Sequence, residues 1–272
     1  MTIVVTIVDQ NEAVLKKVRI ADHAEIAALI PKLVAALSLP STDDAGRPIR
    51  YHLSYRNTRL HNTQTLQEVE INNGDSLVIM PDMLAGAHGQ PGEPELPEPL
   101  VVLDSTPLPD SYQPQQGFPP LQQIDAQTES VSIVFQPDIM QGVFAQARGR
   151  REEVGGILLG NVYTEQQRLL IVVEQILEAK HTSAGPAHVM FTGDTWQDIL
   201  RRRATSDLPV VGWYHSHPGF GIFLSPSDEF IQRNFFGNRP WYIALVVDPT
   251  TEEWGVFAWE AQQIKRCMRP AV

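Results

Sequence analysis

The chain has 272 residues, of which 43% are hydrophobic and 19% are charged. This length and composition are typical of a globular protein with two domains, and they exclude a disordered chain. The formal net charge of −11, from 32 acidic and 21 basic residues, would repel a phosphate backbone, so nucleic acid is not an expected partner.

The chain has a single cysteine, Cys267, so it cannot form an intramolecular disulfide. A single cysteine suits a reducing compartment. Its position near the C-terminus favours a structural role for the thiol over a nucleophilic one. No segment approaches the roughly 18 consecutive apolar residues of a membrane span, and no secretory leader is visible. We therefore expect a cytoplasmic protein that does not contact a membrane.

Residues 1–82 follow the order strand, strand, helix, strand, strand. The patterns that predict these elements lie at 2–8, 13–20, 24–37, 49–55 and 76–80. The first strand is rich in β-branched residues, and the helix has apolar residues at helical spacing, with Pro31 as an unfavourable interior residue. Asn72-Asn73-Gly74-Asp75 is a turn signal before the last strand.

This order, together with the closing stretch 59–80, resembles ubiquitin and its relatives. The resemblance implies an α+β ubiquitin-like β-grasp domain at 1–82, closest to the bacterial YukD-like branch; the alternative is a generic small α+β domain. Conjugated ubiquitin-like proteins resemble one another in ending on Gly-Gly, whereas this chain continues through Gly86 and Gly89. A docking domain within one polypeptide is therefore favoured over a conjugated tag.

Residues 83–128 are predicted to be a proline-rich linker, because ten of the 21 prolines lie between positions 81 and 120. Proline excludes regular helix and favours extended, solvated backbone. Within this linker, the apolar run Leu100-Val101-Val102-Leu103 can lie against a domain as an extra strand.

Residues 129–272 alternate predicted strands and helices, which indicates an α/β domain with a central sheet flanked by helices. The strands are expected at 131–135, 153–163, 168–178, 209–216, 241–248 and 254–260. The helices are expected at 137–148, 194–205 and 226–236.

The segment from His215 to Asp228 carries the chemistry of this second domain. Residues i and i+2 of a strand point to one face, about 6.6 Å apart, so His215 and His217 can bind one metal ion. Ordinary polar packing is the alternative for such a pair. Ser225, Pro226 and Asp228 also form a helix start, with Ser225 as N-cap, and this reading is compatible with Asp228 as a ligand.

Three protein ligands, His215, His217 and Asp228, leave a fourth tetrahedral position open, as in catalytic zinc sites. Zinc lowers the pKa of a bound water toward about 7. No cysteine lies near the motif, which points to attack by water rather than by a thiolate.

The spacing His-x-His-x7-Ser-x2-Asp at 215–228 resembles the signature of the JAMM/MPN+ (JAB) zinc metalloproteases. Their general base is a glutamate before a glycine-and-leucine pattern, which is similar to the stretch from Glu153 to Gly160 here. The resemblance implies one Zn²⁺ per chain, Glu153 as the base that activates the water, and Ser225 as a donor to the oxyanion. The neighbouring Glu152 would face the opposite side of a strand.

The resemblance implies a zinc-dependent, deubiquitinase-like isopeptidase that releases a ubiquitin-like modifier from a target lysine or a precursor tail. Its expected partners are that modifier, its conjugates and the cognate activating and conjugating enzymes. Two alternatives stay open. In the first alternative, the chain is a protease that processes itself after a glycine such as Gly86 or Gly89. In the second, it is a non-catalytic MPN scaffold. Recruitment of the modifier by the N-terminal domain is favoured over inhibition.

Overall fold

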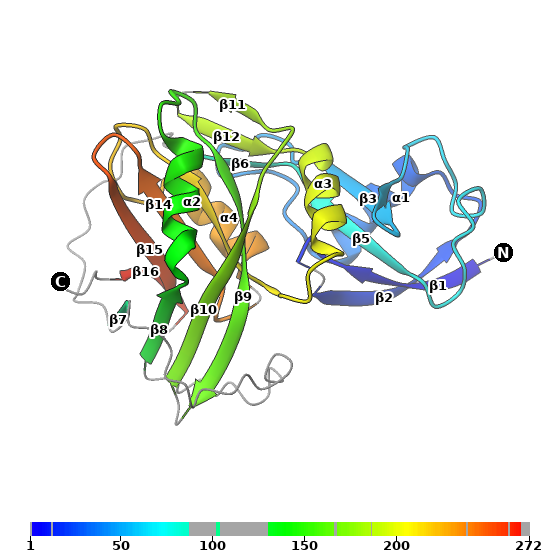
Figure 1. The fold of residues 1–272 in the computed structure, drawn as a ribbon. Coiled ribbons are helices and arrows are strands. Elements are labelled where there is room, and N and C mark those ends of the chain that lie inside the picture. Colours follow the sequence, from blue (N-terminus) through cyan, green and yellow to red (C-terminus); the bar gives the residue numbers. More distant parts are fainter. Residues whose placement is uncertain are drawn as a thin grey trace. The chain divides into compact units, whose positions relative to one another are not determined.

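The structure is a computed structural model that describes residues 2–11, 13–86, 102–103, 130–165, 168–185, 187–237, 239–260 and 262–267. These residues form two compact units. Unit 1 consists of Met1–Met83, Lys180–Ser183 and Met190–Thr205, and unit 2 consists of Leu84–Ala179, Ala184–Val189 and Ser206–Val272. Figure 1 follows both units in chain order.

Unit 1 is built on a five-stranded mixed sheet with the strand order β2-β1-β5-β3-β4. Its strands are β1 (Thr2–Val8), β2 (Val14–Ala21), β3 (Tyr51–Tyr55), β4 (Thr58–Arg59) and β5 (Ser76–Pro81). The central pair β1 and β5 is parallel, and the pairs β1–β2 and β3–β5 are antiparallel. This arrangement confirms the ubiquitin-like fold class expected for the N-terminal region.

One helix, α1 (Ile26–Ala36), covers this sheet. Its residues Ile26, Leu29 and Leu33 are buried at the spacing of one helix face, and they join the apolar core of the sheet. Pro31 lies inside the helix on its exposed side, where the backbone acceptor that it leaves unpaired can reach water.

Unit 1 also includes α3 (Gly193–Arg203), a helix that lies in the second domain by sequence. The fully buried Trp196 donates its Nε1–H to the carbonyl oxygen of Pro81 at 2.9 Å, and the Gly193 amide donates to Asp82 Oδ1 at 2.9 Å. The helix thus packs with the ubiquitin-like strands, which the division at 129 did not anticipate.

Unit 2 is built on an eight-stranded sheet with the order β16-β15-β14-β13-β9-β10-β8-β7. The strands are β7 (Val102–Leu103), β8 (Ser130–Phe135), β9 (Gly155–Glu165), β10 (Arg168–Glu178), β13 (Val210–Ser216), β14 (Ile243–Asp248), β15 (Glu253–Glu260) and β16 (Gln263–Cys267). Strands β13 and β14 are parallel, with α4 (Pro226–Phe235) between them in the chain. Helix α2 (Pro137–Ala147) packs on β8 and β10 (Figure 1).

Two short segments of the expected linker range form strands. Strand β7 pairs in parallel with β8, which confirms the extra strand expected at 100–103. Strand β6 (Met83–Ala85) is the edge of a three-stranded sheet in the order β11-β12-β6, with β11 at Ser183–Gly185 and β12 at His188–Phe191. The sequence patterns did not predict β6, β11, β12 or β16. Apart from Gly86, the rest of the expected linker lies outside the described residues.

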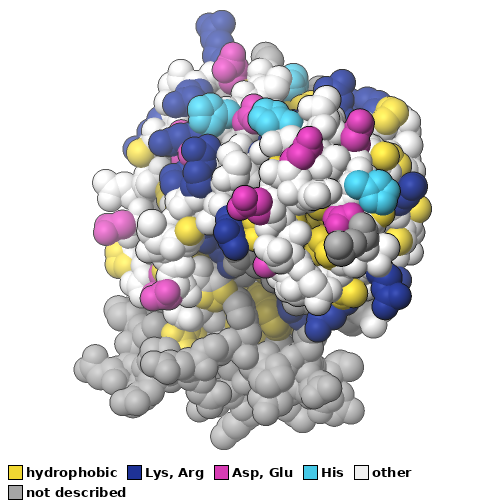
Figure 2. All heavy atoms as spheres, turned by 90° about the vertical axis from the view of Figure 1, so that its right-hand side faces the viewer, with side chains coloured by type: hydrophobic (Ala, Val, Ile, Leu, Met, Phe, Trp, Pro, Cys, Tyr) yellow, Lys and Arg dark blue, Asp and Glu magenta, His cyan; other side chains and the backbone are white. Residues whose placement is uncertain are grey.

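Charged side chains of both signs are interspersed over the face shown in Figure 2. Within the part of the chain that the structure describes, no helix has the length and apolar character needed to cross a membrane.

Candidate metal centre

The end of strand β13 carries the two histidines of the motif. His215 is the penultimate residue of β13, and His217 follows the strand directly. Both side chains are fully buried, and their Nε2 atoms lie 2.9 Å apart. The two imidazoles therefore point toward a common position, as expected for residues i and i+2 of an extended chain.

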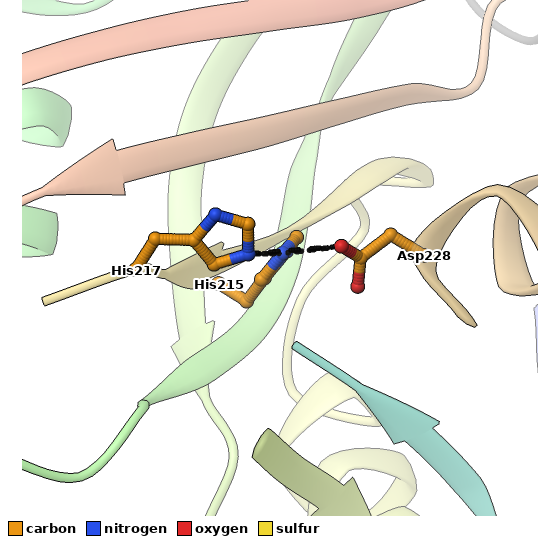
Figure 3. Close-up of side chains that lie close together, drawn as sticks. All are labelled: His215, His217 and Asp228. Atoms are coloured by element: carbon orange, nitrogen blue, oxygen red, sulfur yellow. Dashed lines mark hydrogen bonds and ion pairs between the residues drawn. The ribbon is translucent and has the colours of Figure 1, made fainter. Parts of the chain in front are cut away.

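Helix α4 brings a carboxylate to the same position. Ser225 is the N-cap and accepts a hydrogen bond from the Asp228 amide at 3.2 Å, while the Ser225 amide donates to Asp228 Oδ2 at 2.8 Å. This reciprocal capping box confirms the predicted helix start. The same Asp228 Oδ2 lies 3.3 Å from His215 Nε2 and 3.6 Å from His217 Nε2 (Figure 3).

The three donor atoms fit a tetrahedral zinc ion. Bonds of about 2.0–2.1 Å at tetrahedral angles put two ligand atoms about 3.3 Å apart, and the three separations here are 2.9, 3.3 and 3.6 Å. Burial lowers the pKa of His217. The pKa of Asp228 also lies well below its usual range, because the charges and hydrogen bonds of the two histidines outweigh its burial. Both shifts favour the deprotonated forms that bind a metal.

Glu153 lies next to this donor set, just before strand β9. The paired residues His215 and Gly155 align the two strands, and the Val154 amide donates to Ser216 Oγ at 3.0 Å. The Glu153 side chain is only 1% exposed, whereas Glu152 is exposed. Of the two neighbouring glutamates, the structure therefore turns Glu153 inward.

Two family models match the chain. Residues 138–262 match the family described as prokaryotic homologs of the JAB domain, and residues 2–79 match the family described as WXG100 protein secretion system (Wss), protein YukD. The chain carries a YukD-family domain followed by a JAB-family domain.

Curated relatives align with parts of this chain. The 26S proteasome non-ATPase regulatory subunit 14 of Dictyostelium discoideum is 30% identical over 148 residues, which cover 54% of this chain and 42% of that protein. COP9 signalosome complex subunit 5 of Eremothecium gossypii is 34% identical over 100 residues, 36% of this chain and 23% of that protein. Ubiquitin carboxyl-terminal hydrolase RPN11 of Saccharomyces cerevisiae is 34% identical over 101 residues, 36% of this chain and 31% of that protein.

The chain therefore spans less than half the length of each of these relatives. Among solved structures, Caldiarchaeum subterraneum ubiquitin aligns with a TM-score of 0.24 at 21% identity, over 29% of this chain and 92% of that chain.

Further contacts within the JAB domain orient the rings of His215 and His217. The Trp213 ring stacks on the His215 ring with centroids 4.8 Å apart and an interplanar angle of 9°. Trp213 donates its Nε1–H to Gln232 Oε1 at 2.8 Å, which ties β13 to α4. His217 Nδ1 lies 3.3 Å from the carbonyl oxygen of Gly221. Such contacts hold metal-binding rings in one orientation.

Asp248, at the end of β14, supports the loop that follows His217. Its carboxylate accepts from the amides of Gly219 and Gly221, both at 2.9 Å, and the two glycines have φ of +81° and +83°. Burial acts to raise the pKa of Asp248, but these backbone N–H donors outweigh it and hold the pKa below its usual range. Sequence reasoning missed this residue. The one sequence signal that could have pointed to Asp248 is the Asp-Pro dipeptide at 248–249, which is a turn signal.

A backbone amide from a distant part of unit 2 also reaches the site. The N–H of Gly86 donates to Asp228 Oδ1 at 2.8 Å, across 142 positions of sequence. The β11–β12 hairpin lies nearby, since the Glu153 amide donates to the Gly185 carbonyl at 2.9 Å. Sequence reasoning missed this hairpin, although Gly185-Pro186 is a turn signal.

Proposed function

We propose that this chain is a zinc-dependent peptidase that hydrolyses the bond after the C-terminal glycine of a ubiquitin-like modifier. The bond joins that modifier to a target lysine or to a precursor tail. The observation that carries the proposal is the convergence of His215, His217 and Asp228 on one buried position, with the buried Glu153 on the neighbouring segment. The JAB-family match and the relative named ubiquitin carboxyl-terminal hydrolase support this substrate class.

The chain's own residues divide the chemistry between them. Zinc, when held by the three ligands, supplies an acidic water at neutral pH. The Glu153 carboxylate takes a proton from the attacking water and passes it to the leaving amine. Ser225 accepts a hydrogen bond from Asp228, which leaves its hydroxyl proton free to donate to the oxygen that becomes negative.

A non-catalytic scaffold is the rival proposal, and the buried polar groups argue against it. Two histidines, an aspartate and a glutamate in a protein interior cost free energy unless they are paired or bind a metal. Apolar side chains of similar size would serve a scaffold better. The complete ligand set together with a buried glutamate therefore favours an enzyme.

Two reporters test the proposal. The first is ubiquitin with a fluorescent amine on its terminal glycine. The second is a peptide of residues 80–86, MPDMLAG, with the same amine. The zinc-loaded chain is expected to hydrolyse at least one of them. Glu153→Gln should reduce the rate by about 10²–10⁴-fold, because a general base is lost, while zinc content stays unchanged.

Glu152, the exposed neighbour of Glu153, provides the matched control. Glu152→Gln removes the same charge one residue away and should leave the rate close to that of the parent chain. If neither reporter is hydrolysed by the zinc-loaded chain, its action on separate modifiers is wrong. If Glu153→Gln has the parent's rate, the proposed mechanism is wrong.

A further inference from the structure

The segment that follows the ubiquitin-like domain enters the site as an added strand. Leu84 and Ala85 belong to β6, the edge strand beside β12. The next residue, Gly86, donates its amide hydrogen to Asp228 Oδ1. A peptide that adds a strand to a sheet edge is bound through its backbone, and this fixes which residue reaches the end of the strand.

The position of Gly86 accepts only glycine. Its φ is +132°, in the range that L side chains rarely adopt. A Cβ atom there would lie 2.2 Å from Glu153 Oε2, 2.5 Å from His188 Cα and 2.6 Å from the Ala187 carbonyl oxygen. Two of these atoms are backbone, so the site cannot widen by rotating a side chain. The contacts thus select glycine at this point of a bound chain.

The proposed base and a proposed metal ligand both reach Gly86. Since Cβ is about 1.5 Å from Cα, the 2.2 Å separation puts Glu153 Oε2 within about 3.7 Å of Gly86 Cα. Asp228 Oδ1 is 2.8 Å from the Gly86 nitrogen. The carbonyl carbon of Gly86 is bonded to that Cα, and the peptide bond after Gly86 begins at this carbonyl carbon. The peptide bond therefore lies one covalent bond away from an atom that Glu153 approaches.

We propose that the peptide bond between Gly86 and Ala87 is a substrate of this chain's own site. The inference rests on the proposed function and names one of its substrates. The oxygen of a water molecule bonds to the Gly86 carbonyl carbon, and the carbon–nitrogen bond to residue 87 breaks. The water's protons go to the new amine and to solvent, and residue 86 becomes a terminal carboxylate. The products are residues 1–86, ending in Ala85-Gly86, and residues 87–272.

This inference revises the role favoured from the sequence, in which the tethered N-terminal domain recruits a modifier. That preference rested on the lack of a Gly-Gly tail, whereas the structure seats the single glycine Gly86 beside Glu153 and Asp228. Gly89, the other candidate position for a cut, lies outside the described residues.

Intact mass measurement tests the cut. The full chain is purified with a chelator and then loaded with zinc, and its mass is followed under denaturing conditions. Denaturation is needed because contacts such as Trp196 to Pro81 would keep the two fragments together. We expect loss of the intact chain and equal appearance of fragments 1–86 and 87–272.

Matched variants assign the reaction. Gly86→Ala should slow the cut by roughly tenfold or more, since the site has no room for a Cβ, whereas Gly89→Ala should be cut at the parent rate. Glu153→Gln should slow it by about 10²-fold or more, and Glu152→Gln should not. A cut at another position, an equal cut in Glu153→Gln, or an unchanged rate in Gly86→Ala would overturn the inference.

The two reporters separate this inference from the proposed function. If the zinc-loaded chain hydrolyses a reporter but its own mass never changes, the inference is wrong and the function stands. If the chain cuts itself but hydrolyses neither reporter, the inference stands and action on separate modifiers is wrong. If the parent chain and Gly86→Ala both leave every substrate intact, the proposed function fails, and the inference fails with it.

Hydrogen exchange gives a readout that does not depend on activity. In the uncut Glu153→Gln chain, the amide hydrogen of Gly86 should exchange slowly with solvent because it is hydrogen-bonded to Asp228. When Gly86→Ala is added to this chain, the amide hydrogen of residue 86 should exchange quickly. Fast exchange in both chains would contradict the seating of Gly86 on which the inference rests.

Discussion

The hydroxyl oxygen of Ser216 accepts a hydrogen bond from the Val154 amide at 3.0 Å, and the Ser216 amide donates to the Val154 carbonyl at 2.9 Å. This reciprocal pair joins the segment that carries Glu153 to the strand that carries His215. Both residues are buried, Ser216 completely. The pair thus fixes the distance between the proposed base and the metal ligands.

Ser216→Ala should therefore destabilise the fold and slow turnover. It leaves the buried Val154 amide without its acceptor, at a cost of about 1–3 kcal/mol, which denaturant unfolding measures. The control is Ser54→Ala. Ser54 is also fully buried, but its hydroxyl has no hydrogen-bond partner among the described residues. That variant should be neutral or more stable, and a larger loss in Ser54→Ala would contradict the assignment.

His217→Ala should remove the metal. The parent chain is expected to bind about one zinc, as a three-ligand site does, and the variant should hold little by elemental analysis. Zinc at 1,000 times its Kd should stabilise the parent by about 4 kcal/mol, which raises its melting temperature. Zinc should not shift the melting temperature of the variant. The exposed His23 provides the control, since His23→Ala should bind zinc like the parent.

Asp248→Asn should weaken zinc binding without removing a ligand. The amide group cannot accept from both Gly219 and Gly221, so the loop that positions the Gly221 carbonyl beside His217 loses a support. Loss of a hydrogen bond that supports a metal ligand weakens metal affinity by about 10–100-fold. The control is Asp43→Asn, which disturbs a similar turn in unit 1, where Asp43 accepts from Ala45 and Arg47. Zinc affinity should be unchanged there, and an equal loss in both variants would contradict a local effect.

Asp248 should also make stability depend on acid pH. Its pKa is lower in the folded chain than the ordinary value of 3.8, so the carboxylate contributes stability that is fully present above about pH 4. That contribution is lost as pH falls through the folded pKa. The free energy of unfolding, measured from pH 7 to pH 3, should fall less steeply in Asp248→Asn than in the parent.

Cys267 should be inert toward thiol reagents in the folded chain. Burial raises the pKa of its thiol to about 12, so almost no thiolate is present at neutral pH. Ellman's reagent should react only after unfolding, and Cys267→Ser should retain hydrolysis of the reporters. Inactivation of the folded parent by iodoacetamide would argue for a thiol mechanism in place of the metal.

Local patterns were sufficient for most of the elements and for the donor set. The alternation of strand residues placed His215 and His217 on one side, and the Ser-Pro-x-Asp start of α4 predicted a capped helix that presents Asp228. These signals act over a few residues, because strand and helix periodicity and capping are properties of adjacent backbone. The burial of Glu153 in preference to Glu152 agrees with the spacing that singled it out.

Contacts between distant segments were decided only by the tertiary structure. Strands β6, β11 and β12 are three or four residues long, too short for a periodic pattern, and their pairing depends on the path of the chain. The same holds for α3, whose Trp196 reaches Pro81 across 115 positions. The seating of Gly86 against Asp228 depends on a backbone amide, and backbone amides carry no sequence signal. Its requirement for glycine follows from atoms of Glu153, Ala187 and His188, which only the folded chain brings together.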